Sequence, residues 1–161
     1  KIPGVRIPEV VQQPFVLDCG DHFPTKGVIS NEPPKILGTY RVLVPNCDGN
    51  GNDLGTLLPP EVQVPLATYT GWNLRKREIG AEGMLLSLQG SYIPYPRTEA
   101  DKRASGDPRS SLEAAYGSFD AYQQQFRAVV DDYRKRRLLL AEDADRLIAG
   151  REKWRDWFPK K

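Results

Sequence analysis

The chain has little of what an independently folding enzyme needs. Only 39% of its 161 residues are hydrophobic, and it contains one histidine and one methionine. Most of its 14 glycines and 14 prolines lie in the first hundred residues. Proline fixes φ and lacks a backbone donor, so such a stretch favours neither a long helix nor a central strand. We therefore expect the first half of the chain to lie on another protein body.

The sequence also lacks a recognisable catalytic triad. A serine or cysteine hydrolase needs a nucleophile, a base and an orienting acid. Its one histidine, His22, lies in a loop beside a predicted strand, where a surface or hydrogen-bonded role is more typical than catalysis. No Gly-x-Ser-x-Gly elbow is present, since Ser91 and Ser118 follow a glycine but lack the second one. We assign no catalytic residue and expect this chain alone to be inactive.

Two cysteines, Cys19 and Cys47, give no metal or redox motif because they do not form a Cys-x-x-Cys pair. They leave two alternatives open, one disulfide in an oxidising compartment or two separate thiols. The oxygen-rich residues 48–53 resemble the start of a calcium loop. However, Asp53 replaces the glycine and Pro59 replaces the bidentate glutamate of the EF-hand pattern. Turn chemistry explains the same residues, so we predict no metal and no cofactor, and a calcium-stabilised module is the weaker hypothesis.

Charge and hydropathy argue against two further classes of partner. The 23 basic and 21 acidic residues give a net charge of +2, too small to attract nucleic acid or anionic lipid. The densest basic run, residues 134–137, follows acidic residues one helical turn earlier, which is typical of a solvated face. No apolar run reaches the roughly 20 residues that span a bilayer. The chain begins with Lys1 rather than Met, so we expect further protein to precede it.

Residues 1–75 are predicted to form an extended, proline-rich arm with a β-hairpin. The strand candidates are the short apolar runs at residues 15–17, 27–29 and 40–45. Residues 47–53 carry the strongest turn signal and should reverse the chain, so that residues 42–44 pair with residues 62–69. A two-stranded ribbon is only marginally stable in water, so we expect it to dock on a larger sheet or body.

Residues 76–109 are predicted to be a loop region, and residues 110–158 to be helical. Ser110 and Glu113 fit a capping box at the start of a short helix. Ser118 should cap a longer helix that follows. The apolar residues of that helix recur at helical spacing: Phe119, Tyr122, Phe126, Val129, Val130 and Tyr133.

A third helix is expected from Ala141, because Glu142 and Asp143 favour its positive end. The C-terminal part is therefore predicted to be a helical hairpin. Together with the extended arm it gives an irregular α+β fold.

Residues 64–75 hold the densest mixture of hydroxyl, aromatic, amide and guanidinium groups in the chain. Such a cluster suits either a buried polar junction or the wall of a pocket. Physical reasoning alone favours the junction, since Trp and Tyr side chains are amphipathic and commonly seal interfaces.

Several segments, taken in order, resemble one protein family. The most specific is Pro-Leu-Ala-Thr-Tyr-Thr-Gly-Trp-Asn at residues 65–73. The others lie at residues 2–8, 32–34, 40–45, 48–50, 90–94, 106–113 and 116–122. These segments are similar to the C-terminal part of bacterial proteins labelled alpha/beta hydrolase domain-containing, which look like exported serine esterases.

The resemblance implies that this chain completes an α/β-hydrolase body whose nucleophile and catalytic histidine lie upstream. The partner would be the upstream catalytic part of the same protein or a companion chain. The substrate would be a small carboxylic ester, lactone or related acyl compound, and the location would be periplasmic or secreted. The expected substrate-binding residues are Tyr69, Trp72, Asn73 and Arg75. Arg75 could pair with a carboxylate on the larger part or on the substrate.

A non-enzymatic assembly or binding subunit is the alternative hypothesis from a different class. The low apolar content and the long proline-rich arm support it. Both hypotheses require a partner, and they differ in whether the assembled particle turns over an ester.

Overall fold

The computed structural model describes residues 14–40, 46–82, 84–86 and 88–159. The chain divides into two compact units. We call Ile7–Val44 the arm unit, and Lys1–Arg6 together with Pro45–Lys161 the main unit.

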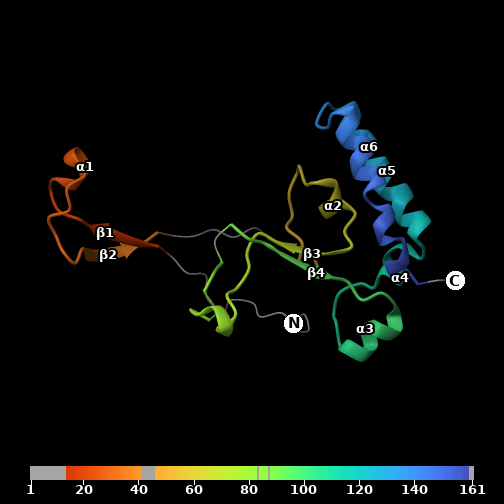
Figure 1. Cartoon of the computed structure of the whole chain (residues 1–161), viewed down its shortest axis with the longest axis horizontal. Helices are drawn as coiled ribbons and strands as arrows, with labels where there is room; N and C mark the ends of the chain where they lie inside the picture. The colour runs from red at the N-terminus through yellow and green to blue at the C-terminus, as the bar shows by residue number, and fades with distance from the viewer. Residues whose placement is uncertain (1–13, 41–45, 83, 87, 160–161) are drawn as a thin grey trace. The chain divides into compact units, whose positions relative to one another are not determined.

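The described part of the arm unit is an antiparallel ribbon with one short helical turn. Strand β1 (Phe15–Asp18) pairs with strand β2 (Lys35–Thr39), and a bulge interrupts the register after Val16. Helix α1 (Phe23–Lys26) lies in the connection between the strands (Figure 1). The strand predicted at residues 15–17 is therefore confirmed.

The arm unit differs from the prediction in its second strand. Residues 27–29 form no strand, because Gly27 ends α1 in a left-handed conformation with φ 67°. β1 pairs with β2, which was not among the predicted strands because Lys35 and Gly38 weaken the strand signal in the sequence. Of the predicted strand at 40–45, residues 41–45 lie outside the described residues.

The main unit contains a second two-stranded antiparallel sheet, formed by β3 (Ala67–Thr70) and β4 (Ser91–Pro94). Thr70 lies opposite Ser91 at one end of the register. Gly90 directly precedes β4, and a Cβ atom there would lie only 2.2 Å from the carbonyl oxygen of Thr70. The close approach of the two strands at this end therefore requires glycine.

The sequence did not predict the pairing of β3 with β4. The expected partner, residues 42–44, lies outside the described residues. β4 comes from the segment that was expected to be loop. Part of the expected strand at residues 62–69 is also helical, because Pro60 begins the short helix α2 (Pro60–Gln63).

Two local features flank this sheet. The predicted turn at residues 47–53 is confirmed, and an isolated antiparallel bridge joins Cys47 to Asp53 across it. A 3-10 helix, η1 (Arg77–Ile79), lies between β3 and β4.

Helix α3 (Glu99–Ser105) follows β4 in the segment that was expected to be a loop region. It begins with a capping box in which the Thr98 hydroxyl accepts from Asp101 N, and the Asp101 carboxylate accepts from Thr98 N. The segment is thus charged but helical. A helix without large apolar side chains carries little apolar periodicity, which is why it was missed.

Helix α4 (Leu112–Tyr116) begins one residue later than predicted. Its cap is Ser111, whose hydroxyl oxygen accepts from Ala114 N at 3.0 Å. Ser110 instead uses its backbone N–H to donate to Asn50 Oδ1 at 3.1 Å. This tertiary contact decides which of the two adjacent serines caps α4, a choice that the local sequence does not indicate.

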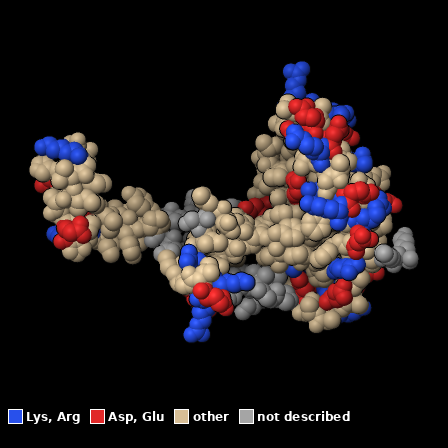
Figure 2. Space-filling model, viewed as in Figure 1, with Lys and Arg blue, Asp and Glu red and all other residues tan. Residues whose placement is uncertain are grey.

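The predicted helical hairpin is present at the C-terminal side of the main unit. Helix α5 (Phe119–Lys135) is capped by Ser118, and helix α6 (Ala141–Ala149) packs beside it (Figure 1). The 3-10 helix η2 (Glu152–Trp157) follows. On the face drawn in Figure 2, acidic and basic side chains cover the outer surface of this hairpin.

The hydrophobic core of the main unit joins the helices to the chain around β3 and β4. Its buried residues are Val64, Leu66, Tyr95, Leu112, Phe119, Tyr122, Phe126, Val130, Ala144 and Phe158. The apolar stripe predicted for α5 therefore faces the core, with Val129 only partly buried at its edge. Among the residues that the structure describes, no helix is long and apolar enough to cross a bilayer.

Replacing Phe126 with Ala should lower the free energy of unfolding by about 3–5 kcal/mol, because the ring is fully buried and its loss leaves a cavity. Gln125→Ala, on the exposed side of the same helix, is the matched control and should change stability by less than about 0.5 kcal/mol. Urea unfolding followed by circular dichroism measures both. Equal effects of the two substitutions would contradict the assigned core.

Candidate functional site

The segment at residues 64–75 contributes to two different environments. Thr68 and Tyr69, on β3, take part in a buried polar junction. Residues 72–75, just after β3, line a pocket. The two alternatives that the sequence left open are therefore both present, one on each side of the end of β3.

Asn52 is the first centre of the polar junction. Its side chain is 2% exposed. The Nδ2 group donates to the carbonyl oxygen of Ala67 at 3.1 Å and to the hydroxyl of Tyr95 at 2.7 Å. The Oδ1 atom accepts from Tyr69 N at 2.8 Å. One amide side chain therefore ties the turn at residues 48–51 to β3 and to the residue that follows β4.

Arg109 is the second centre, and it forms a buried ion pair with Asp107. The two side chains are 3% and 7% exposed, and Nη2 lies 2.6 Å from Asp107 Oδ2. Nη1 donates to Thr68 Oγ1 at 3.0 Å and to the Ile93 carbonyl oxygen at 2.7 Å. Nη2 also donates to the Pro94 carbonyl oxygen at 2.9 Å. All three guanidinium nitrogens thus have an acceptor, since Nε also bonds Asp107.

The electrostatics of this pair follow from its contacts. Hydrogen bonds from Arg109 lower the pKa of the Asp107 carboxyl, and they outweigh the opposing effect of burial. The carboxylate therefore remains charged at neutral pH. The guanidinium also lies 5.3 Å from the centre of the Tyr95 ring, a cation–π distance that adds to the packing.

The oxygen-rich stretch next to this junction is explained by turn chemistry. Asp48 Oδ1 accepts from Asn50 N at 2.8 Å and from Asn52 N at 2.9 Å. Asp53 Oδ1 accepts from the thiol of Cys47 at 3.5 Å. In the described residues, no group of three or more His, Cys, Asp or Glu side chains is placed to hold a metal ion.

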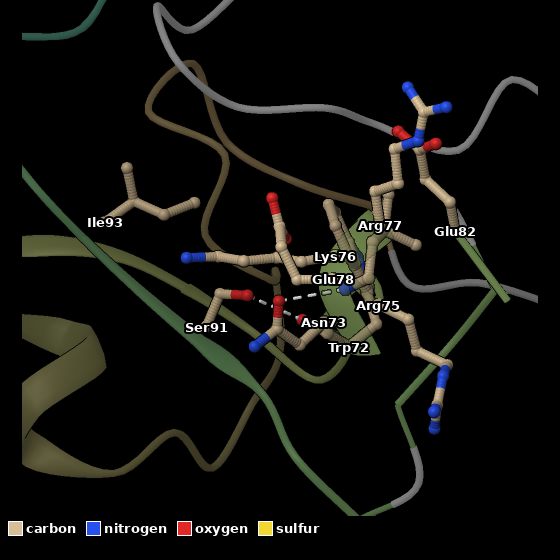
Figure 3. Close-up of a pocket in the computed structure, with 10 residues that line it drawn as sticks. Trp72, Asn73, Arg75, Lys76, Arg77, Glu78, Glu82, Ser91 and Ile93 are labelled. Atoms are coloured by element: carbon tan, nitrogen blue, oxygen red, sulfur yellow. Dashed lines mark hydrogen bonds between the residues drawn. The ribbon is translucent and has the colours of Figure 1, made fainter. Parts of the chain in front are cut away.

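An open pocket with a volume of about 570 Å³ lies where the chain leaves β3 and enters β4 (Figure 3). This volume is in the range that small-molecule sites occupy. The pocket is lined by Trp72, Asn73, Leu74, Arg75, Lys76, Arg77, Glu78, Glu82, Ser91 and Ile93. It therefore combines an indole, two aliphatic side chains, an amide, a hydroxyl and charges of both signs.

Hydrogen bonds to the Trp72 carbonyl oxygen fix the chain at the start of the pocket wall. Thr70 Oγ1 donates to it at 2.5 Å and Ser91 Oγ donates at 2.9 Å. The Asn73 side chain accepts from Leu74 N through Oδ1 at 2.9 Å. Within the described part of the chain, its Nδ2 group makes no hydrogen bond and is available to a ligand.

Arg75 lines the same pocket, but its guanidinium group is turned onto its own loop. Nε donates to the carbonyl oxygen of Gly80 at 2.9 Å, and Nη2 donates to that of Ile79 at 2.8 Å. In Figure 3 the group points away from Asn73 and Ser91. These contacts close the loop that contains η1, which gives Arg75 a clear structural role.

Tyr69, the fourth expected binding residue, does not line this pocket. Its ring packs edge-to-face on Tyr92 at 5.4 Å, and Tyr92 stacks on Trp154 at 5.7 Å. Burial raises the pKa of the Tyr69 hydroxyl well above its usual range, so the group stays neutral.

His22 and Cys19 belong to the arm unit, whereas Cys47 lies at the start of the turn at residues 47–53. His22 directly precedes α1, is exposed, and accepts from Lys26 N through its carbonyl oxygen at 2.9 Å. Cys19 is partly buried and Cys47 is exposed, and the choice between one disulfide and two thiols stays a prediction.

Sequence reasoning singled out three residues that line the pocket and missed the residues that hold the junction. Lys76 and Ser91 were not proposed as pocket residues, although both line it. Asp107 and Arg109 could have been noticed as opposite charges on either side of Pro108, which constrains the turn between them. Nothing in the local sequence indicates that Arg109 reaches β3 and β4.

Taken together, the described residues form a mixed α+β chain with small antiparallel sheets, several helices and a pocket beside one sheet. Residues 17–149 match the family described as alpha/beta hydrolase domain, and the chain belongs to that family. Comparisons with curated proteins and with solved structures gave no match. The sequence-based resemblance to alpha/beta hydrolase proteins is thereby confirmed.

Arg109→Ala should lower the free energy of unfolding by about 3–5 kcal/mol, because it leaves the buried Asp107 carboxylate without its partner. The matched control is Arg103→Ala, an exposed arginine of α3, for which we expect a change within about 0.5 kcal/mol. Chemical denaturation of both variants measures the difference. A mild effect of Arg109→Ala would mean that the junction does not hold β3 and β4.

The same pair predicts an acid dependence of stability. The pKa of Asp107 is lower in the folded state than its unfolded value of about 4, so its contribution is present above that pH and is lost as pH falls below it. The urea midpoint should therefore drop between about pH 5 and about pH 3. Asp107→Asn should start from a lower midpoint and show a smaller drop, and an unchanged drop would exclude this carboxyl as a cause.

Proposed function

We propose that this chain is the C-terminal part of an α/β-fold serine hydrolase that cleaves a carboxylic ester, a lactone or a related acyl compound. The observation that carries the proposal is the match of residues 17–149 to the alpha/beta hydrolase domain. The 161 residues contain no Gly-x-Ser-x-Gly elbow and one histidine, His22, which lies in a different unit from the pocket. The nucleophile, acid, base and oxyanion donors would therefore come from an upstream catalytic part of the same protein or from a companion chain.

Within this proposal the chain braces the catalytic part and supplies one wall of the acyl pocket. Trp72 offers an apolar surface, and the Asn73 amide offers a donor for a carbonyl or hydroxyl oxygen of the substrate. Tyr69 and Arg75 would act indirectly, Tyr69 by packing against β4 and Arg75 by closing the η1 loop. The protein would work in the periplasm or outside the cell.

A non-enzymatic assembly subunit is the second candidate, and one observation favours it. Several large apolar side chains of the main unit are exposed, among them Leu54, Leu57, Met84 and Leu88. Such side chains suit an interface whether or not the assembled particle is an enzyme. The two candidates are separated by treating the complete protein with a serine-directed fluorophosphonate. A hydrolase is labelled and turns over an ester such as p-nitrophenyl acetate, whereas an assembly subunit does neither.

In the complete protein, Asn73→Ala and Trp72→Ala should each lower kcat/KM for an ester by about tenfold, mainly through KM, because they remove binding contacts rather than the nucleophile. Fluorophosphonate should still label the serine completely in both variants. Asn46→Ala, an exposed asparagine that does not line the pocket, is the control and should leave kcat/KM unchanged. Wild-type kinetics in both pocket variants would remove residues 72 and 73 from the substrate site.

A further inference from the structure

The charged side chains that line the pocket beside β3 and β4 do not balance one another. Three are basic, Arg75, Lys76 and Arg77, and two are acidic, Glu78 and Glu82. Glu82 already has an interaction partner. None of the three basic side chains forms an ion pair within the part of the chain that the structure describes. Positive charge therefore predominates in the pocket wall, which favours a ligand with a negative charge.

Two of the three basic side chains are poorly placed to meet such a ligand. The Arg75 guanidinium donates to two backbone carbonyl oxygens of its own loop. The Arg77 side chain extends away from Asn73 and Ser91 in Figure 3. Both arginines thus add to the local potential, and the direct contact with a ligand is left to Lys76.

Lys76 is the basic residue that faces the rest of the pocket wall. In Figure 3 its side chain extends toward Ser91 and Ile93, on the side opposite to Arg77. Its ammonium group makes no hydrogen bond or ion pair with any residue that the structure describes, and Glu78 lines the same pocket without pairing with it. A full positive charge is therefore available in the wall.

The neighbours of Lys76 indicate the chemistry of the group that it would bind. The indole of Trp72 and the side chain of Ile93 offer apolar surface to a hydrocarbon chain, and Asn73 Nδ2 is a neutral donor without a partner. One ammonium and one amide suit a singly charged carboxylate, which accepts charge-assisted hydrogen bonds through two oxygens. The wall thus matches an aliphatic chain that carries a carboxylate.

We propose that Lys76 is a specificity-determining residue that selects acyl substrates bearing a carboxylate away from the bond to be cleaved. This inference rests on the proposed function for the reaction itself. It adds the substrate class and the residue that recognises it. Because Lys76 is exposed, its contribution should be that of a solvent-accessible ion pair, about fivefold in affinity.

Two esters that differ in charge test the proposal in the complete protein. Mono-p-nitrophenyl adipate carries a distal carboxylate, and methyl p-nitrophenyl adipate is its neutral counterpart. Lys76→Gln should lower the ratio of their kcat/KM values, anionic over neutral, by about fivefold, mainly through KM for the anionic ester. Lys76→Arg keeps the charge and should retain most of the ratio. A ratio that Lys76→Gln leaves unchanged would overturn the proposal.

A matched lysine controls for the overall charge of the protein. Lys135 is an exposed residue of α5 that does not line the pocket, so Lys135→Gln should leave the ratio within about 1.5-fold of the wild type. Equal losses in the two variants would overturn the proposal. A lower Tm in Lys76→Gln with slower turnover of both esters and an unchanged ratio would also overturn it, because Lys76 would then pair with a carboxylate of the catalytic part.

A binding measurement separates this inference from the proposed activity. By calorimetry, the complete protein should bind hexanoate about fivefold more tightly than the neutral hexanamide, and Lys76→Gln should remove the difference. This result without fluorophosphonate labelling supports the anion site and rejects the serine hydrolase. Labelling together with affinities that do not depend on Lys76 supports the hydrolase and rejects the anion site.

Discussion

The guanidinium group of Arg109 is the contact on which the arrangement of the main unit depends. It binds the Thr68 hydroxyl on β3 and the carbonyl oxygens of Ile93 and Pro94 on β4, so it fastens both strands of a sheet that is marginal by itself. A lysine could not replace it, because a single ammonium group lacks the planar fork that serves these acceptors together with Asp107. The pocket wall begins two residues after β3, so its position depends on the same contact.

The sequence predicted the long helix of the main unit better than its strands. Helix signals lie close together in the sequence, whereas strand pairing joins residues that are far apart in it. The cap Ser118 and the apolar repeat of α5 lie within one segment, and both are as predicted. The pairing of β3 joins residues more than twenty apart, and β4 contains a serine and a proline that give a weak strand signal. The start of α4 was missed by one residue because Asn50 engages the backbone of Ser110.

The candidate site likewise combines residues that the sequence indicated with contacts that it did not indicate. Trp72 and Asn73 were expected to bind substrate once the family resemblance was considered, and the structure places both in the wall of a pocket. Arg75 and Tyr69 came from the same stretch, yet one is bound to its own loop and the other packs in an aromatic row. Alternation along an extended chain separates neighbours onto different surfaces, so proximity in sequence overstates proximity in the site. The Arg109 junction depends on non-local contacts that no local pattern encodes.

Phe158 carries a consequence for how the protein is made. Its ring is 2% exposed and packs against Tyr116, Phe119 and Tyr122, residues that belong to α4 and α5. Synthesis runs from the N-terminus, so these aromatic residues leave the ribosome some forty positions before the residue that covers them. Until then Phe119 and Tyr122, at the start of α5, lack one of the aromatic rings that cover them. The nascent chain therefore passes through an interval in which a chaperone has an apolar surface to bind, and this aromatic cluster is completed only after Phe158 has been synthesised.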